Sequence, residues 1–574
     1  MNLPRFVHNP LFDIALLAVL LAAFFGFSLG LRPYSVPSES RYVEIGREMA
    51  ESGDFVTPRL NYVKYFEKPP LFYWIQAQAT KHWGLDFFTA RIPTAAFAIL
   101  LCLVTYGLGH MLYGRLAGWL GAGVLATSLY MFALSRIVLV DVPVSFFIVS
   151  ALTGFLYALS APESRKRTII IYSSYAAAAC AVLTKGLIGA VLPGIVIFLW
   201  LAFTKRWQVL KTMRLCSGLL LFLAIAVPWH VMVAARNPEF SHFYFIHEHF
   251  ERYLTKEHGR YQPAWFFLAV FVAGLFPWTI FTWQAAWGGL KGFWDNRLQD
   301  GKQLFLLLWI LVILVFFSLS DSKLIPYILP IFPPVAALIG GYFARVWQEE
   351  KPAAGFGWGV LVMILLLLLM AIAPSVLTGW LDPEDKILVA LRDGGDELHV
   401  LSVAAMIAGA ALLITYIQGR KRHVVLCLIA IAALVMGLGD QVAAHYNSDS
   451  TQDFTSIITQ LYKPGDEVAS YQYYYQDLPI YLKHLVTVVD FKGELEFGTQ
   501  HQDTSAWMID GKTFWKRWMK GDHLMFVIMR AGAFEQLMAG KKPEDLHLYF
   551  GKKDGRNVMF INRPPETLED RLKK

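Results

Sequence analysis

Long uninterrupted stretches of apolar residues constrain this chain more than any other feature. Several of them approach the length of about twenty residues that an α-helix needs to cross a bilayer. The chain has 574 residues, of which 56% are hydrophobic and only 17% are charged, whereas an average globular domain carries about 25% charged residues. These values exclude a soluble multidomain enzyme, a disordered protein and a fibrous protein. The sequence therefore predicts a polytopic α-helical membrane protein.

The apolar stretches predict thirteen spans. A stretch at 169–203 is too long for one span, and the polar sequence Thr184-Lys185-Gly186 divides it into two. The predicted spans are Leu11–Leu31, Thr89–Leu112, Leu116–Leu134, Val138–Ser160, Ile169–Thr184, Leu187–Phe203, Leu215–Ala234, Ala264–Ala286, Leu304–Ser320, Leu324–Ala344, Gly357–Leu377, Leu401–Ile417 and Val424–Ala443.

The distribution of Lys and Arg over the short loops predicts the orientation, because such loops are enriched in cations on the cytoplasmic side. One set of loops holds sixteen Lys and Arg residues, including 165–167 and 420–422, and the opposite set holds five. The first set is predicted to be cytoplasmic, so the N-terminus lies inside and the C-terminal tail outside. The formal net charge of +7 then reflects topology, and no nucleic-acid partner is expected.

Two domains are predicted. Residues 1–445 form the transmembrane domain, with a first outer loop at 32–88 that carries interfacial helices and a second long outer loop at 236–263. Residues 446–574 form a small soluble α/β domain outside the membrane, because short β-like and helical segments alternate there. The expected strands are Glu467–Gln472, Leu485–Asp490, His523–Met529 and Asn557–Asn562, and the expected helices include Asp453–Leu461 and Gly532–Ala539.

Charged residues of the outer loops and span ends point to a site. An ionisable group at membrane depth is costly, so it needs a partner or a function. Under the predicted topology, residues of five separate outer segments converge on one face. They are Glu39, Arg41, Glu44, Glu67, Lys68, Arg136, Asp141, Lys185, His247, His249, Arg252 and Lys323, with Tyr42, Tyr65 and Tyr327 beside them. This mixture of cations, carboxylates and tyrosines suits a phosphate-bearing lipid that carries a sugar.

Structural explanations compete with functional ones at several positions. Arg136 fits an anchor whose side chain extends to the membrane interface. Lys185 fits that role less well, because almost no loop separates its two helices, and Asp141 lies in a strongly apolar segment that favours an ion pair or a site. The stretch Tyr42–Met49 is amphipathic, which predicts a helix on the bilayer surface with Arg41, Glu44 and Arg47 towards the headgroups.

Five spaced segments resemble one known family, if the three sequences of the first outer loop are counted as one segment. The sequences Glu39–Ile45, Gly53–Pro58 and Tyr65–Pro69 resemble the first periplasmic loop of the lipid A aminoarabinose transferases, which belong to the GT-C and protein O-mannosyltransferase superfamily. The resemblance continues to about Leu338. Its further matches are Val140–Pro143, Leu183–Gly186, Glu248-His249 with Arg252, and Ser322-Lys323 with Pro326–Leu329.

The resemblance implies a GT-C fold and an inverting sugar transfer at the periplasmic face of a Gram-negative inner membrane. The donor would be undecaprenyl phosphate carrying 4-amino-4-deoxy-L-arabinose or a related sugar, and the acceptor a lipid A phosphate or another periplasmic molecule. A monomer that needs no nucleotide cofactor is expected.

The resemblance also assigns roles to residues. Lys185, Arg252 and Tyr327 match positions that hold the donor phosphate and carrier lipid, and Glu67 with His247 or His249 would hold a divalent cation. The expected catalytic residues are Glu39, Asp141, Lys185 and Arg252. The expected substrate-binding residues are Arg41, Tyr42, Glu44, Tyr65, Glu67, Lys68, Lys323 and Tyr327.

One position departs from the family, which usually begins its first motif with Asp-Glu where this chain has Ser38-Glu39. A Ser or Thr acceptor needs a general base, worth roughly 10²–10⁴-fold in rate. A phosphate acceptor is already anionic near neutral pH, because its second pKa is about 6. Ser38 therefore favours a phosphate acceptor, or a transfer of the missing role to Glu39 or Asp141, and it is equally compatible with a different substrate.

Two other functions fit the same features. The fold also suits an enzyme that glycosylates Ser or Thr residues of secreted proteins. A transporter or flippase of lipid-linked sugars would also carry many spans and charges at membrane depth. The gathering of charges on one face and the long first outer loop argue against the transporter.

Overall fold

The chain divides into two compact units. The computed structural model describes residues 10–251, 261–296, 301–349, 355–377, 395–444, 450–540, 542–554 and 556–564. One unit, here called the membrane unit, comprises Met1–Leu31 and Arg91–Tyr446. The other comprises Arg32–Ala90 and Asn447–Lys574, and we call it the composite unit because it joins the first outer loop to the C-terminal domain. The sequence-based division placed the first outer loop with the spans instead.

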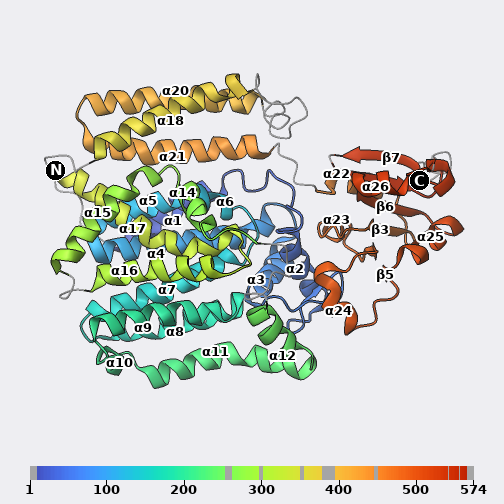
Figure 1. The fold of residues 1–574 in the computed structure, drawn as a ribbon, viewed down its shortest axis with the longest axis horizontal. Coiled ribbons are helices and arrows are strands. Elements are labelled where there is room, and N and C mark those ends of the chain that lie inside the picture. The colour runs from blue at the N-terminus through green and yellow to red at the C-terminus, as the bar shows by residue number, and fades with distance from the viewer. Residues whose placement is uncertain are drawn as a thin grey trace. The chain divides into compact units, whose positions relative to one another are not determined.

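The membrane unit is helical, and its long helices run lengthwise beside one another (Figure 1). Its elements are α1 (Pro10–Gly26), α4 (Ile92–Tyr113), α5 (Arg115–Ala126), α6 (Leu129–Leu134), α7 (Asp141–Ser160), α8 (Arg165–Lys185), α9 (Ile188–Thr204), α10 (Val209–Thr212), α11 (Leu215–Arg236), α12 (Phe240–His242), the π-helix η3 (Phe243–Glu251), α14 (Phe266–Gly274), α15 (Thr279–Asn296), α16 (Lys302–Leu319), the 3₁₀-helix η4 (Ile325–Ile331), α17 (Phe332–Gln348), α18 (Phe356–Leu377), α20 (Gly395–Ile417) and α21 (Lys421–Ala444). A short 3₁₀-helix, η2 (Thr89–Arg91), leads into α4.

Each of the thirteen predicted spans contains a helix. Among the described residues, nine helices are long and apolar enough to cross a membrane. Helices α14 and α15 form a further pair that is bent by 102°, and α1, α5 and α9 are apolar but shorter. The prediction of a polytopic helical membrane protein is confirmed, and the count of thirteen spans stays a prediction. The predicted division of 169–203 is confirmed, because α8 ends at Lys185 and α9 begins at Ile188.

Close backbone contact holds the centre of the membrane unit together. A Cβ atom on Gly340 of α17 would lie 2.5 Å from the Ala117 carbonyl oxygen of α5, and one on Gly121 of α5 would lie 3.1 Å from the Ala336 carbonyl oxygen. Small residues at a helix crossing let two backbones approach, which is a common packing mode in membranes. Larger side chains at these positions would push α5 and α17 apart.

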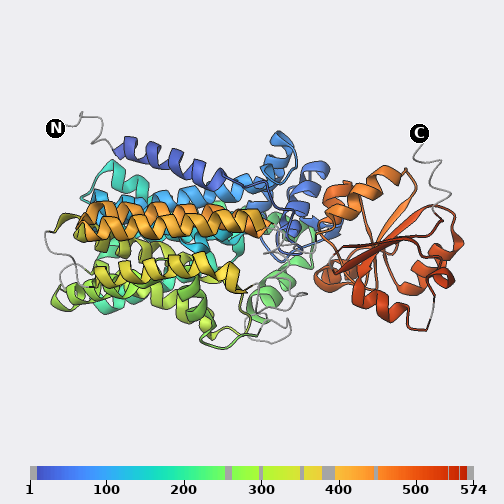
Figure 2. The same ribbon diagram turned by 90° about the horizontal axis from the view of Figure 1, so that it is seen from above.

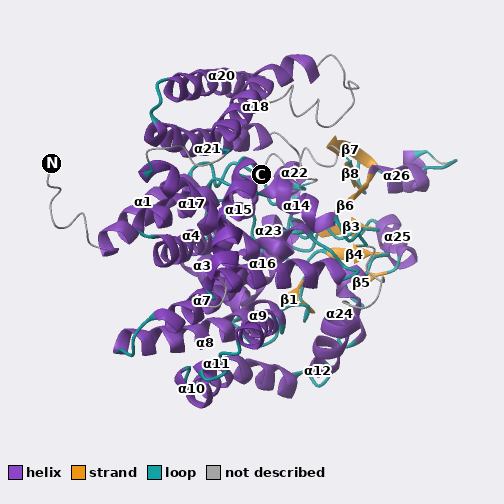
Figure 3. Cartoon of the chain, turned by 60° about the vertical axis from the view of Figure 1, so that its left-hand side comes forward, coloured by secondary structure: helices purple, strands orange, loops and turns teal. Residues whose placement is uncertain are grey.

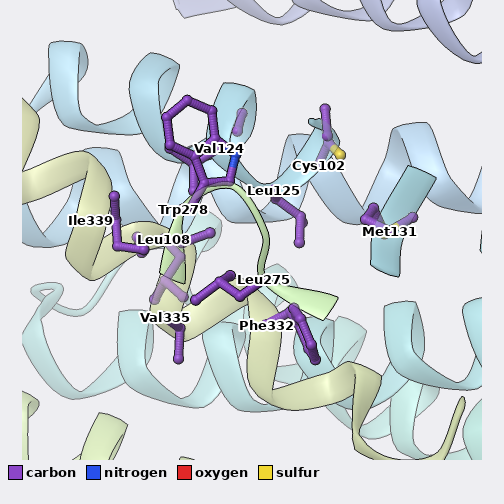
Figure 4. Packing of buried hydrophobic residues seen from close by; sticks show 14 of the residues in the cluster. Cys102, Leu108, Val124, Leu125, Met131, Leu275, Trp278, Phe332, Val335 and Ile339 are labelled. Atoms are coloured by element: carbon purple, nitrogen blue, oxygen red, sulfur yellow. The ribbon is translucent and has the colours of Figure 1, made fainter. Parts of the chain in front are cut away.

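Large side chains fill the space around this crossing (Figure 4). Trp278, at the bend between α14 and α15, is fully buried beside Leu275 and Leu108. Its indole Nε1 donates a hydrogen bond to Thr127 Oγ1 at 3.1 Å. A buried Trp needs such an acceptor for its single N–H. The bend is therefore held both by packing and by a satisfied polar contact.

The composite unit is a mixed α/β structure. Its first-loop part contains α2 (Ser40–Ser52), the hairpin strands β1 (Arg59–Leu60) and β2 (Val63–Lys64), and α3 (Leu71–Trp83). Its C-terminal part is the α/β domain in which Figures 2 and 3 show strands between helices. The C-terminal elements are α22 (Gln452–Leu461), β3 (Glu467–Tyr471), α23 (Leu478–Leu482), β4 (Thr487–Val489), η5 (Gly493–Leu495), α24 (Glu496–Gln500), β5 (Met508–Ile509), α25 (Gly511–Lys520), β6 (Met525–Arg530), α26 (Ala531–Leu537), η6 (Pro543–Leu546), β7 (Tyr549–Asp554) and β8 (Asn557–Ile561).

The C-terminal sheet has the strand order β5-β4-β3-β6-β8-β7. The first four strands in this order are parallel, and β8 and β7 extend the sheet in antiparallel fashion. Both faces are covered, because alternate residues of β6 point to opposite cores: Phe526 packs with α22, and Val527 packs with α25. The predicted α/β domain is confirmed, and its four predicted strands overlap β3, β4, β6 and β8.

Candidate functional site

In the membrane unit, Asp141 and Lys185 form an ion pair. Asp141 is the first residue of α7, and Lys185 is the last residue of α8 before Gly186, whose φ of 92° ends the helix. A carboxylate is favoured at a helix N-terminus and a cation at a C-terminus, so the two helices place the charges where their dipoles stabilise them. Each side chain is 9% exposed, which makes the electrostatic interaction stronger than it would be in water.

Tyr327 completes this cluster. The Lys185 ammonium lies 4.3 Å from the centre of the Tyr327 ring, a distance that allows a cation–π interaction. The backbone of η4 around Tyr327 is fixed on both sides, because Tyr130 donates a hydrogen bond to the Ile325 carbonyl and Trp309 donates one to the Pro330 carbonyl at 3.0 Å. Three predicted site residues therefore meet, and Lys185 retains N–H donors for an anion beyond its bond to Asp141.

Lys323 is buried and holds backbone segments together. Its ammonium donates hydrogen bonds to the carbonyl oxygens of Ser320 at 2.5 Å and Gln262 at 2.9 Å. These contacts join the segment after α16 to the segment before α14. They give Lys323 a structural role, and its predicted contact with substrate stays a prediction.

In the composite unit, a second cluster surrounds Arg41. The Arg41 Nε atom lies 2.6 Å from Glu494 Oε2, and the two side chains are 15% and 12% exposed. Burial alone would lower the pKa of Arg41, but Tyr65, Glu494, Glu67 and Tyr42 outweigh it and raise this pKa well above its usual value. Arg41 is therefore a permanently charged guanidinium among predicted site residues. The Tyr42 ring stacks against Tyr73 at 6.0 Å.

The prediction that Glu44 and Arg47 of α2 face the lipid headgroups is wrong. Glu44 and Arg47 are buried and form a bidentate pair at 2.6 and 2.7 Å, so they do not face lipid headgroups. Glu48, one turn further along, accepts the Tyr62 backbone N–H at 2.9 Å. Burial raises the pKa of Glu48 well above its usual range, and the charge of Glu44 raises it further. The amphipathic pattern instead reflects a charged face that is neutralised inside the unit.

Other predicted residues of the first loop make local contacts. Glu39 is buried and accepts a hydrogen bond from the Ser35 backbone N–H at 3.1 Å, which supports the turn before α2. Lys68 donates a hydrogen bond to the Glu67 carbonyl oxygen at 2.6 Å. These contacts do not test the catalytic role predicted for Glu39 or the binding roles predicted for Glu67 and Lys68, which stay predictions.

The predicted cation site at Glu67 and His247 or His249 stays a prediction. The ring of His247 stacks on Phe243 at 5.1 Å, and its Nδ1 lies 3.8 Å from Glu248 Oε1. In the part of the chain that the structure describes, no group of three or more His, Cys, Asp or Glu side chains is arranged to hold a metal ion. The side chain of His249 and all of Arg252 lie outside the described residues.

Arg136 is not an interfacial anchor. Its side chain is 1% exposed and pairs with Asp440 of α21 at 3.1 Å. It also donates to the Phe27 carbonyl oxygen at the end of α1 at 2.8 Å, and Ser28 Oγ donates to Asp440 at 2.6 Å. Arg136 thus joins α1 to α21 and belongs to the framework of the membrane unit.

Within the described residues, Asp141, Lys185 and Tyr327 form one cluster in the membrane unit, and Arg41 lies with Tyr42, Tyr65 and Glu67 in a second cluster in the composite unit. Two further residues of the Arg41 cluster, Glu494 and Gln476, were missed. Both lie in the C-terminal domain, and Gln476 Nε2 donates a hydrogen bond to Glu494 Oε1 at 2.6 Å. No local pattern marks them, because their partner Arg41 lies at the other end of the sequence.

Two families match parts of the chain. Residues 11–244 match the family "Dolichyl-phosphate-mannose-protein mannosyltransferase", and residues 454–550 match the "Aminoarabinose transferase C-terminal domain". The first match includes α1, the first outer loop and the Asp141–Lys185 pair. The second covers most of the sheet that carries Gln476 and Glu494.

Curated relatives are aminoarabinose transferases by name. The chain is 32% identical over 320 residues to the "Undecaprenyl phosphate-alpha-4-amino-4-deoxy-L-arabinose arabinosyl transferase 1" of Proteus mirabilis, covering 55% of this chain and 56% of that protein. It is 27% identical over 420 residues to the corresponding transferase 2 of Sodalis glossinidius, covering 73% and 75%. The chain thus spans little more than half the length of the Proteus relative.

A solved structure matches over a longer range. The crystal structure of ArnT from Cupriavidus metallidurans bound to undecaprenyl phosphate superposes with a TM-score of 0.81 and 27% identity, covering 97% of this chain and 99% of that one. Its apo state gives a TM-score of 0.80. The match includes both the helical part and the C-terminal domain. The two family models, the curated relatives and this solved structure therefore make the chain similar to aminoarabinose transferases in both its helical part and its C-terminal domain.

Proposed function

We propose that this protein transfers 4-amino-4-deoxy-L-arabinose, or a related sugar, from undecaprenyl phosphate to a phosphate of lipid A at the periplasmic face of the inner membrane. The observation that carries the proposal is the buried Asp141–Lys185 pair beneath Tyr327. It lies in a chain whose relatives are named for the undecaprenyl-linked sugar and whose structural match holds undecaprenyl phosphate.

The proposed reaction is a single inverting displacement. An oxygen of the acceptor phosphate attacks C1 of the sugar while the bond from C1 to the carrier phosphate oxygen breaks. The electron pair of that bond leaves with undecaprenyl phosphate, and the acceptor becomes a phosphodiester. An anionic acceptor oxygen has no proton to lose, so the reaction balances without a general base, in agreement with Ser38 at the position where the family has Asp.

Lys185 acts on the leaving group in this scheme. Negative charge grows on the carrier phosphate as the bond to C1 breaks, and a preorganised cation at that position lowers the barrier. Asp141 keeps the ammonium oriented, and the Tyr327 ring fixes it from the side. Arg252 would supply a second cation, and its role rests on the family motif alone.

The divalent cation predicted at Glu67 and His247 or His249 stays a prediction, and no step of the proposed reaction depends on it. Dependence on such a cation is tested separately by chelation. Addition of EDTA to the purified enzyme would abolish transfer if Glu67 and a histidine hold an essential ion, and it would leave the rate unchanged if they do not.

A cellular experiment tests the function. The chain is expressed in a Gram-negative host that makes the lipid-linked amino sugar but lacks its own transferase, and lipid A is examined by mass spectrometry. We expect one or two additions of about 131 Da, the residue mass of an aminopentose on a phosphate ester. Unmodified lipid A would contradict the proposal.

One alternative has its own support, since residues 11–244 match a family named for transfer to protein. The same cultures therefore serve for glycopeptide analysis of periplasmic proteins. If Ser or Thr residues carry the sugar while lipid A stays unmodified, the acceptor is protein and not lipid A. A flippase would instead move a radiolabelled lipid-linked sugar across vesicles without any covalent transfer.

A further inference from the structure

The C-terminal domain has the topology of a ligand-binding sheet. Its parallel strands run in the order β5-β4-β3-β6, so the chain moves outward in one direction from β3 to β4 and β5, and then returns to the other side with β6. In open α/β sheets, ligands bind beyond the carboxyl ends of the strands where this direction reverses. The reversal lies between β3 and β6, so the segment after β3 borders that place, and the segment after β4 lies beside it at the same carboxyl edge of the sheet.

These segments hold the first outer loop of the same chain. Gln476 follows β3 and Glu494 follows β4. Gln476 donates to one carboxylate oxygen of Glu494 at 2.6 Å, and the other oxygen lies 2.6 Å from Arg41 Nε of α2. Tyr474, in the segment after β3, interacts electrostatically with Glu44 and Glu48 of α2. The guanidinium of Arg41 thus lies at the carboxyl edge of the parallel strands.

A second set of contacts holds the hairpin β1–β2. The Asn61 side chain donates to the Val486 carbonyl at 2.8 Å and accepts the Val486 N–H at 3.2 Å. Gln502 Nε2 donates to the Tyr62 carbonyl at 3.0 Å, and Trp507 Nε1 donates to the Asn61 carbonyl at 3.2 Å. The hairpin leads directly into Tyr65–Lys68, so two of the three motif segments of the first loop are tied to the C-terminal domain.

The Arg41–Glu494 pair is better explained as a device that fixes the arrangement of side chains than as a source of folding stability. A buried ion pair often contributes little net free energy, because desolvation offsets the attraction, and its best-attested use is to specify one arrangement. The hydrogen bond from Gln476 fixes the carboxylate, and the carboxylate fixes the guanidinium. This chain of contacts sets the position of a cation beside Tyr65 and Glu67.

We propose that Glu494 is a positioning residue for Arg41, and that the C-terminal domain serves the reaction by holding the first outer loop in its working geometry. The proposal rests on the proposed function for its kinetic consequence. It gives the domain a role within this chain, without a ligand of its own at the ends of β3 and β4.

The kinetic test compares Glu494→Gln with Glu467→Gln. The control makes the same substitution in the same domain, at the start of β3, where Glu467 pairs with Arg517 and accepts a bond from Thr487. Misplacement of a binding group can lower the rate by up to about 10². We expect Glu494→Gln to lower kcat/KM by roughly tenfold or more, Glu494→Asp to recover part of the loss, and Glu467→Gln to stay within about twofold of wild type.

A second variant distinguishes a loss of positioning from a loss of folded protein. Gln476→Leu removes the hydrogen bond to Glu494 but leaves the ion pair intact, so we expect a smaller loss in the same direction with an unchanged unfolding temperature. A loss of activity in Glu494→Gln that merely follows a lowered folded fraction, with Gln476→Leu fully active, would overturn the positioning role.

Hydrogen exchange provides a readout that does not depend on glycosyl transfer. In full-length protein, Glu494→Gln should raise the exchange of amides in α2 while Glu467→Gln leaves them protected. Unchanged protection of α2 in Glu494→Gln would also overturn the proposal. If wild-type protein transfers no sugar, the proposed function fails, and the exchange experiment still decides whether Glu494 holds the first loop.

Discussion

The two units each contain an ion pair that includes a family-motif residue and is largely shielded from solvent, but they build it differently. In the membrane unit, Asp141 and Lys185 lie at the ends of two helices that follow one another in the chain. In the composite unit, Arg41 pairs with Glu494, which most of the sequence separates from it. The first pair needs only a helix hairpin to form. The second needs the complete chain, so its geometry depends on the C-terminal domain.

The surroundings of the two pairs indicate two different roles. The Lys185 ammonium retains donors beyond its bond to Asp141, and an aromatic ring covers one side of it. Arg41 is enclosed by a carboxylate, tyrosines and a second glutamate. We therefore interpret the Lys185 pair as the part that acts on the leaving group, and the Arg41 pair as the part that orders the first outer loop.

The largest effect should come from the membrane pair. Lys185→Ala removes a preorganised cation, which typically lowers a rate by about 10²–10³, and we expect transfer by purified protein to fall by that factor. The variant also leaves Asp141 buried without its partner. The double variant Lys185→Met/Asp141→Asn should therefore regain thermal stability without regaining activity. If the double variant regained both thermal stability and activity, the pair would have only a structural role.

A structural pair in the same unit sharpens the contrast. Arg136 and Asp440 are buried together, and breaking one side of a buried pair costs about 3–5 kcal/mol. We expect Arg136→Ala to lower the unfolding temperature in detergent strongly, while the protein that remains folded keeps its kcat. Arg517→Ala breaks a half-exposed pair and should change stability by about 0–1 kcal/mol. A stable but inactive Arg136→Ala would place Arg136 in the chemistry instead.

A third effect is a pH dependence in the composite unit. Burial raises the pKa of Asp477 to about 6, although hydrogen bonds from Thr451 and Ser450 oppose the shift. Because the folded pKa exceeds the unfolded value of about 3.9, this group's contribution to stability is complete below the unfolded value and is lost as the pH rises through 6. The loss should reach about 3 kcal/mol by pH 7.

Asp477→Asn tests the direction of this pH dependence of stability, because a neutral amide resembles the protonated acid. Calorimetric unfolding between pH 4 and 7 should show wild type losing stability relative to the variant as the pH rises. Parallel curves for the two proteins would mean that Asp477 titrates near its ordinary pKa in the folded state.

Local patterns predicted much of the fold. The polar sequence at Thr184–Gly186 predicted the break between α8 and α9, and the strand-like sequence of 467–472 predicted β3. The Asp141–Lys185 pair was among the predicted site residues because charges in apolar segments need partners. Each of these features depends on residues that are near one another in the sequence.

Features that depend on distant partners were not predictable in this way. The pattern of α2 was interpreted as a surface helix, because nothing nearby reveals that Glu44 and Arg47 neutralise each other in a buried environment. The same reason hid Glu494 and Gln476. The placement of the first outer loop with the C-terminal domain follows from contacts such as Asn61 with Val486, which no local period encodes.

The most direct test of the proposed function is a reconstituted transfer reaction. Purified protein in bilayers receives undecaprenyl phosphate carrying the amino sugar, together with lipid A, and the products are weighed by mass spectrometry. We predict sugar covalently attached to lipid A, free undecaprenyl phosphate in equal amount, and neither product with Lys185→Ala. Unaltered lipid A beside intact donor, or full transfer by Lys185→Ala, would contradict the account.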